Sequence, residues 1–258
     1  MSDSFYVPLG DGVFRSTAWT TGPWGPDAQH AGPPSALLGR AIEGAAPAGA
    51  HIARVTSEIL RPVPIEDVKV EARVRRPGRS VALLEATLTA GAVEVMRASG
   101  WAIGTTDVDL PADAAPRAEP QRPPDALPNL FEDRAETDYI AAMEWRFVSG
   151  SFFELGPATA WLRMKLPLVQ DEEPTPLQRV LTAADSSSGI SGALDFSQWV
   201  YVNPDLTVHL HRALEGQWVC LDAVTTPERN GVGLTAAALY DRRGPVGRSA
   251  QSLFVARR

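Results

Sequence analysis

The order of apolar and polar positions follows the same course twice along the chain. Residues 30–104 begin with a helix-like run, in which apolar residues such as Leu38 and Ile42 recur at helical spacing, and continue with extended segments. Residues 175–257 repeat this course, because a second helix-like run over 175–188 is again followed by strand-like segments. A repeat of this size predicts two similar structural units, each with one helix and several strands.

Alternation identifies the strands. Between residues 68 and 75, apolar side chains at even positions alternate with charged ones at odd positions, which is the period of a strand with one buried face. The second half contains further strand-like stretches at 139–148, 158–166, 199–202, 207–214, 218–225, 232–241 and 246–256. Since an apolar helix must be covered, we expect the sheet of each half to wrap its helix.

A proline-rich stretch separates the two halves. Residues 111–124 contain few large apolar side chains, which is typical of an extended surface linker. We therefore expect an N-terminal domain over 1–108, a linker over 109–130 and a C-terminal domain over 131–258. The fold class that fits this pattern is α+β, with a long helix wrapped by a curved antiparallel sheet in each half.

Composition narrows the range of partners and compartments. The formal net charge of −7 and the pI near 5.2 provide no general attraction to nucleic acid or anionic membranes. Cys220 is the only cysteine, so the chain can form no internal disulfide and no thiolate zinc cluster. No apolar run reaches the roughly 18 residues that a membrane span requires. We expect a cytoplasmic protein without nucleic-acid or membrane partners.

Several short motifs resemble those of the double-hotdog acyl-CoA thioesterases, the bacterial acyl-CoA thioesterase II group. Residues 30–38, HAGPPSALL, resemble the His-Gly-Gly opening of that family's first helix, and residues 59–62, ILRP, resemble its following strand. Residues 182–186, TAADS, and 248–252, RSAQS, are similar to its aspartate and glutamine motifs. The resemblance covers nearly the whole chain. It implies a tandem (double) hotdog fold and, by analogy, a homodimer.

The resemblance also implies an activity and two of its residues. Family members hydrolyse a fatty acyl-CoA with an activated water, without a metal, a cofactor or a covalent intermediate. The aspartate carries over to Asp185 and the glutamine to Gln251. A carboxylate that is partly shielded from water is a suitable general base, and an amide can accept one hydrogen bond while it donates another. Asp185 is thus expected to activate the water, and Gln251 to orient it.

The third member of the family's set, a threonine or serine hydroxyl, is not present at its matching position. That position, two residues before Asp195, is Ala193. Nearby serines offer a replacement hydroxyl, and we take Ser187 as the candidate, with Ser188 and Ser191 as alternatives. This departure leaves a second function open, that of a non-catalytic acyl-CoA-binding or scaffolding protein.

The start of the first helix is the candidate substrate-binding site. Backbone N–H groups near Gly32 and Ser35 point out of a helix N-terminus and could receive the oxyanion of a tetrahedral intermediate. Pro33 and Pro34 have no N–H, so the donors are few. His30 could contact the substrate, although a capping or packing role fits it equally well.

The second half contains two other patterns that bear on function. Asn203-Pro204 followed by His209 faintly resembles the hydratase version of the fold, but Tyr201 stands where an aspartate is expected. His209 and His211 share one strand face without acidic or thiol residues at ligand spacing, which favours packing over metal binding. We therefore predict neither a hydratase nor a metal site.

Overall fold

One continuous sheet organises the computed structural model, which describes residues 3–111, 114 and 120–258. The N-terminal half contributes β1 (Tyr6–Gly10), β2 (Val13–Ser16), β3 (Ala50–Ile59), β4 (Asp67–Arg76), β5 (Val81–Ala90) and β6 (Val93–Gly104). The C-terminal half contributes β7 (Met143–Ser149), β8 (Ala158–Met164), β9 (Trp199–Val202), β10 (Asp205–Leu210), β11 (Val219–Pro227), β12 (Val232–Asp241) and β13 (Gly244–Arg257). The α-helices are α1 (Gly32–Ala45), α2 (Tyr139–Ala142), α3 (Pro176–Ala184) and α4 (Ser187–Ile190).

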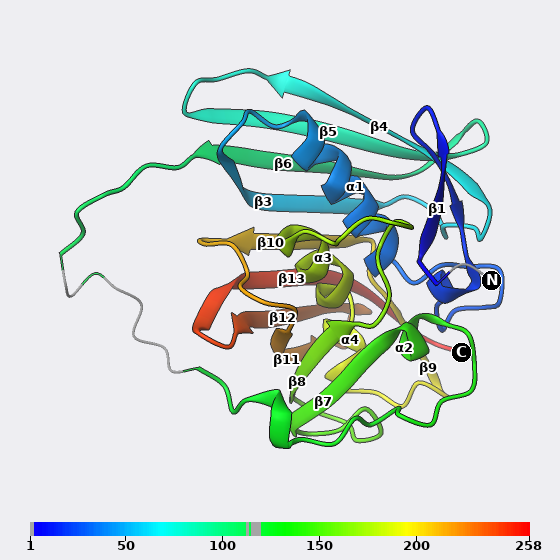
Figure 1. Ribbon diagram of the computed structural model, residues 1–258. Helices are drawn as coiled ribbons and strands as arrows, with labels where there is room; N and C mark the ends of the chain where they lie inside the picture. The colour runs from blue at the N-terminus through cyan, green and yellow to red at the C-terminus, as the bar shows by residue number, and fades with distance from the viewer. Residues whose placement is uncertain (1–2, 112–113, 115–119) are drawn as a thin grey trace.

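The two halves join edge to edge. The strands follow the order β1-β2-β4-β5-β6-β3-β10-β13-β12-β11-β8-β7, with β9 paired to β13. At the centre, β3 and β10 pair antiparallel, from Asp205 opposite Glu58 to His209 opposite Arg54. Figure 1 shows the N-terminal half, from blue to teal, above the C-terminal half, from green to red. This β3–β10 seam brings side chains of both halves onto one inner face.

The two main helices pack against each other on that inner face. Helix α1 covers β4, β5 and β6, while α3 lies against β8 and β11 and beside α1. They run antiparallel, because Glu43 near the end of α1 accepts a 2.7 Å hydrogen bond from Thr175, the residue that caps the start of α3. Gly39 permits the close approach, since a Cβ there would lie 2.3 Å from Leu181 Cδ1. The first two turns of α1 are consequently buried.

Two elements differ from the sequence prediction. Residues 139–148, predicted as one strand, begin with the short helix α2, because the Asp138 side chain accepts the Ala141 N–H and caps a helical turn. The second long helix, predicted to reach residue 188, ends at Ala184. It is followed by Asp185 and the short helix α4, so the aspartate lies at a break between two helices.

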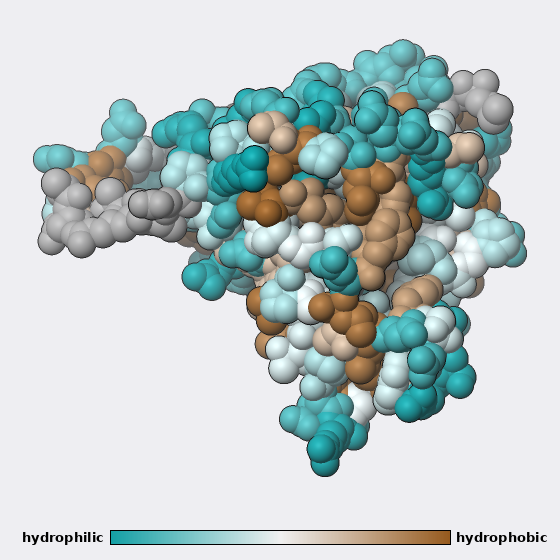
Figure 2. Space-filling view, turned by 90° about the horizontal axis from the view of Figure 1, so that it is seen from below, coloured by the Kyte–Doolittle hydropathy of each residue, from teal (hydrophilic) through white to brown (hydrophobic). Residues whose placement is uncertain are grey.

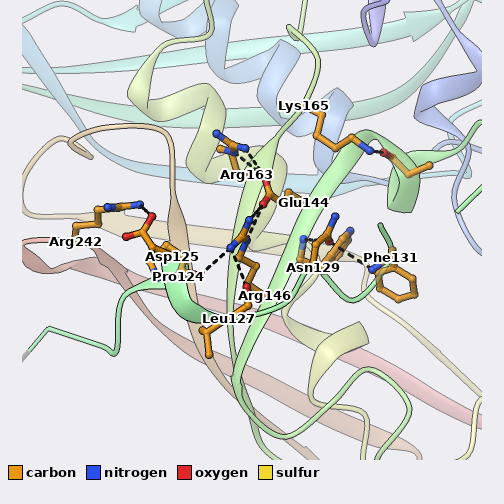
Figure 3. Close-up of polar contacts among 12 residues, drawn as sticks. Pro124, Asp125, Leu127, Asn129, Phe131, Glu144, Arg146, Arg163, Lys165 and Arg242 are labelled. Atoms are coloured by element: carbon orange, nitrogen blue, oxygen red, sulfur yellow. Dashed lines mark hydrogen bonds and ion pairs between the residues drawn. The ribbon is translucent and has the colours of Figure 1, made fainter. Parts of the chain in front are cut away.

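The segment after residue 120 packs against the C-terminal half. Arg146 on β7 donates to the carbonyl oxygens of Pro124 and Leu127 at 3.1 and 2.8 Å, and Glu144 lies between Arg146 and Arg163 (Figure 3). Indole Nε1 of Trp161 donates to the Arg122 carbonyl at 2.7 Å. Residues 112–113 and 115–119 of the expected linker lie outside the described residues. The end of the linker, from 122 to 130, therefore covers part of the C-terminal sheet.

Candidate active site

The carboxylate of Asp185 lies at the C-cap of α3, and its surroundings come from both halves of the chain. The residue is only 6% exposed. Its Oδ1 accepts hydrogen bonds from Asn203 Nδ2 at 2.9 Å and from Gln251 Nε2 at 3.2 Å. Its Oδ2 lies 3.1 Å from Nδ1 of His30. The α3 C-terminus is the negative end of the helix dipole, so these contacts offset an unfavourable local field.

Gln251 reaches the aspartate from the sheet. It lies on the inner face of β13, opposite Thr235 of β12, and is fully buried. Its amide nitrogen also donates to the backbone oxygen of Asp185 at 3.2 Å. Its Oε1 has no hydrogen-bond partner among the described residues. Beside the carboxylate, Gln251 therefore keeps one free acceptor.

His30 is clamped next to Asp185 by a stacked ring. The imidazole and the Tyr139 ring are nearly parallel, with 3.7 Å between their centroids. The Tyr139 hydroxyl is fixed in turn, since it donates to the Thr182 carbonyl at 2.7 Å and lies 2.8 Å from Ser186 Oγ. Burial lowers the pKa of His30, although the Asp185 charge opposes this shift. A lowered pKa favours the neutral imidazole over the protonated one.

The start of α1 offers fewer donors than the sequence predicts. The Ser35 N–H bonds to the Ala31 carbonyl at 3.0 Å, and Pro33 and Pro34 have no N–H. The Gly32 N–H remains, and it points at Nδ1 of His30 from 3.1 Å. A side chain at Gly32 would clash, because a Cβ would lie 2.4 Å from the Thr182 carbonyl oxygen. Of the two expected oxyanion donors, only Gly32 is placed beside the His30–Asp185 pair.

Two of the three candidate serine hydroxyls bind other groups. Ser187 Oγ donates to the Ala184 carbonyl at 2.7 Å, and Ser191 Oγ donates to the Ser187 carbonyl and contacts Thr225. Neither these two side chains nor Ser188 hydrogen-bonds to the Asp185 carboxylate. The structure thus brings together Asp185, Gln251, His30 and Gly32, but not Ser187.

Asn203 is the site residue that sequence reasoning missed. It lies between β9 and β10, and its Nδ2 donates to both Asp185 Oδ1 and the Asp205 carbonyl. The Asn203-Pro204 dipeptide was noticed in the sequence, but only as a feature of a different reaction. Asn203 precedes β10, which pairs with β13, the strand of Gln251, and the local sequence carries no signal for this pairing.

Neither a metal centre nor a membrane span is found in the described part of the chain. Residues 3–111, 114 and 120–258 contain no group of three or more His, Cys, Asp or Glu side chains placed to hold a metal ion. Within the same ranges, no helix is long and apolar enough to cross a membrane.

Comparison with protein families identifies the family to which the chain belongs. The model of the acyl-CoA thioesterase C-terminal domain matches residues 111–255, which is more than half of the chain, and that of the N-terminal domain matches residues 20–103. The chain belongs to the acyl-CoA thioesterase family. No protein of curated function matches the sequence. The resemblance seen in the short motifs is confirmed.

Solved structures show which fold this thioesterase-family chain has. A suspected thioesterase II from Thermobifida fusca superposes with a TM-score of 0.77 at 18% identity, covering 99% of this chain and 96% of that one. A protein of unknown function with a hot dog fold from Alicyclobacillus acidocaldarius gives 0.76 at 14% identity, with coverage of 98% and 97%. Acyl-CoA thioesterase II TesB2 from Mycobacterium marinum gives 0.65 at 15%, with 98% and 95% covered. The chain therefore has the hotdog fold.

Proposed function

We propose that this chain hydrolyses a fatty acyl-CoA to a free fatty acid and coenzyme A, with Asp185 as the general base. Family membership supports the thioester as substrate. The observation that carries the mechanism is the Asp185 carboxylate, nearly buried and held by Asn203, Gln251 and His30. A carboxylate with fixed partners and little exposure to water is suited to remove a proton at one defined place.

Free hydrogen-bonding capacity beside Asp185 supports a bound water. Gln251 Oε1 is buried without a partner among the described residues, and it belongs to the amide that donates to Asp185. Thr182 Oγ1, one helical turn before Asp185, is likewise buried and unpartnered within the described ranges. Because buried polar atoms are rarely left unsatisfied, Gln251 Oε1 is a fitting contact for the attacking water, and Thr182 Oγ1 is a second candidate.

The proposed reaction needs only groups at this site. The water oxygen bonds to the thioester carbonyl carbon while one water proton passes to Asp185. The carbonyl electrons move to the oxygen, which the Gly32 N–H stabilises. When the tetrahedral intermediate collapses, the carbon–sulfur bond breaks, and the coenzyme A thiolate leaves with a proton that originates from Asp185. The carboxylate is then restored without any metal or redox partner.

We further propose that the two halves are tandem hotdog domains, split by the linker over 109–130, and that the protein is a homodimer. Helices α1 and α3 occupy corresponding places in the halves. Viewed from the side of the C-terminal half, the surface carries apolar patches between hydrophilic regions (Figure 2). On the outer face of that half, Val232 and Leu234 of β12 and Phe254 of β13 are more than half exposed. A second copy would cover these side chains, and light scattering would measure the mass.

The experiment that tests this function is the release of coenzyme A from acyl-CoA substrates of short to long chain length. We expect turnover by the wild type and a loss of about 10²–10⁴-fold in Asp185→Asn, the usual effect of removing a general base. Asp195→Asn is the matched control, since Asp195 is an exposed aspartate on a nearby loop. Binding of every acyl-CoA without turnover by the wild type would instead establish the non-catalytic binding protein.

A further inference from the structure

Nδ1 of His30 faces two groups that make opposite demands on it. The Gly32 N–H lies 3.1 Å away and needs an acceptor. Asp185 Oδ2, also 3.1 Å away, needs a donor when the carboxylate is ionised. A neutral imidazole carries its proton on one nitrogen only, so Nδ1 can satisfy one of these neighbours and not both.

The relative strength of the two contacts decides between them. A hydrogen bond to a charged group is stronger than one between neutral groups. A bare Nδ1 lone pair would, in addition, face a carboxylate oxygen at contact distance. Stacking on Tyr139, whose hydroxyl is tied to Thr182, holds the plane of the ring toward both groups. The proton therefore belongs on Nδ1, between the ring and Asp185.

We propose that ionised Asp185 holds His30 as its Nδ1–H tautomer and thereby releases the Gly32 N–H to receive the carbonyl oxygen of the thioester. Gly32 occupies the first position of α1, where an N–H has no partner within the helix. Within the first turn it is the only N–H not bonded to a backbone carbonyl. His30 is thus a positioning residue, which makes the oxyanion donor available only while the general base is charged. The identity of the acceptor rests on the proposed function, whereas the tautomer does not.

The tautomer can be read directly by long-range ¹H–¹⁵N correlation spectroscopy of the imidazole rings at pH 8, with His30→Gln identifying the resonance. We expect a neutral ring protonated on Nδ1 in the wild type. In Asp185→Asn, the donors Asn203 and Gln251 fix the amide oxygen in the place of Oδ1, so its NH₂ group faces His30. The ring should then switch to Nε2–H.

His51 is the internal control, because its Nε2 faces the Leu210 carbonyl at 3.2 Å and must carry the proton in every variant. A wild-type His30 ring protonated on Nε2 or on both nitrogens would overturn the proposal, as would an unchanged tautomer in Asp185→Asn. Circular dichroism shows whether the Asp185→Asn variant is folded. If the variant does not fold, the spectrum of the wild type alone still decides the resting tautomer of His30.

The second measurement follows the Gly32 amide resonance while two unreactive ligands are added. One is an acyl-CoA analogue in which CH₂ replaces the thioester sulfur, which keeps the carbonyl; the other is a thioether that lacks the carbonyl. We expect a large shift of the Gly32 amide resonance with the analogue that keeps the carbonyl, and a small shift with the thioether. Equal shifts with both, or no shift with either, would overturn the role of Gly32.

The outcomes separate this proposal from the thioesterase function. An Nδ1–H ring in a protein that releases no coenzyme A retains the tautomer assignment and rejects hydrolysis. An active enzyme with an Nε2–H ring retains hydrolysis and rejects the tautomer assignment.

Discussion

Asn203 donates a hydrogen bond through Nδ2 to Oδ1 of Asp185 at 2.9 Å, and the same nitrogen donates to the Asp205 carbonyl at 3.2 Å. An amide nitrogen has two hydrogens, so Asn203 can bind the carboxylate while it remains anchored to the backbone that enters β10. A family hydroxyl is expected at Ala193, yet here an amide supplies a fixed donor to the base. We interpret Asn203 as a positioning residue for Asp185.

Replacing Asn203 tests this interpretation. In Asn203→Ala, Asp185 loses a donor to its charged form, and hydrogen bonds to charged groups contribute about 1.5–3 kcal/mol. We expect kcat/KM to fall by about 10- to 100-fold, because a loss of roughly 1.4 kcal/mol corresponds to a tenfold lower rate constant. Asn230→Ala, in an exposed turn, is the control and should retain full activity. Equal kinetics in the two variants would reject the role of Asn203.

Exchange of Gln251 for glutamate should change the pH profile. The substitution places a second carboxylate beside Asp185, in a position now filled by an amide donor at 3.2 Å. Two adjacent carboxylates cannot both ionise easily, so the pair keeps a proton to higher pH. We expect lower kcat/KM at pH 7 and an acid limb of the profile displaced to higher pH. A profile with the wild-type shape and position would contradict direct contact between the two side chains.

Two glycines of α1 form a matched pair for stability measurements. A methyl group at Gly32 would press on the Thr182 carbonyl, whereas a Cβ at Gly44 meets no atom within 4 Å. In urea titrations, we expect Gly32→Ala to lower the free energy of unfolding by about 1–3 kcal/mol, as overpacking does. Gly44→Ala should raise it by about 0.5–1 kcal/mol, because alanine is the better helix former. Similar changes in both variants would show that α1 and α3 do not approach closely.

The buried carboxylate of Asp241 should account for part of the loss of folding stability at acid pH. Burial alone would raise its pKa, but hydrogen bonds from Arg212 and from the Glu215 and Arg243 amides outweigh this, so the pKa lies below its ordinary value. A carboxyl group whose pKa is lowered by folding stabilises the protein above its unfolded pKa, near 4. That stability is lost as the pH falls through the folded pKa.

Asp241→Asn should therefore lower the free energy of unfolding at pH 7, by about 3 kcal/mol for a broken buried ion pair, and flatten its decline below pH 5. Urea titrations from pH 3 to pH 8 measure both effects. Asp125→Asn removes an exposed partner of Arg242 and should change little. An Asp241→Asn curve parallel to that of the wild type would refute the assignment.

Cys220 reports whether the end of the linker stays in place. The thiol is buried with Leu127, Trp161 and Trp218, and burial raises its pKa well above the ordinary value. We expect no reaction of the folded protein with a thiol reagent such as dithiobis(nitrobenzoate), and full reaction in denaturant. Rapid reaction without denaturant would show that the segment around Leu127 opens readily.

The sequence predicted the helices and strands better than the tertiary contacts between them. The helix containing Leu38 and Ile42 was predictable from its periodicity, and the alternating strand at 68–75 from its period of two. Asp185 and Gln251 were found because their motifs resemble a family, and the structure brings them into contact. The family itself was predicted correctly.

What sequence could not provide were contacts between distant elements. Asn203 reaches Asp185 only because β10 pairs with β13, and no local pattern specifies that register. The stacking of His30 on Tyr139 depends in the same way on α2, which was predicted as a strand because its cap, Asp138, was overlooked. The hydrogen bond from Ser187 Oγ to the Ala184 carbonyl likewise depends on the helix break at Asp185, which the hydrophobic periodicity did not indicate.

The β3–β10 seam affects how the molecule unfolds. Strands β3 and β10 pair from Asp205 opposite Glu58 to His209 opposite Arg54. Without this pairing, each of them would be an edge strand of its own half. If one half opened, it would expose a row of unpaired backbone groups on the other, a costly intermediate that invites aggregation. Although its sequence is divided into two similar parts, the protein should therefore melt in one cooperative transition, and a chain cut within the linker should stay together.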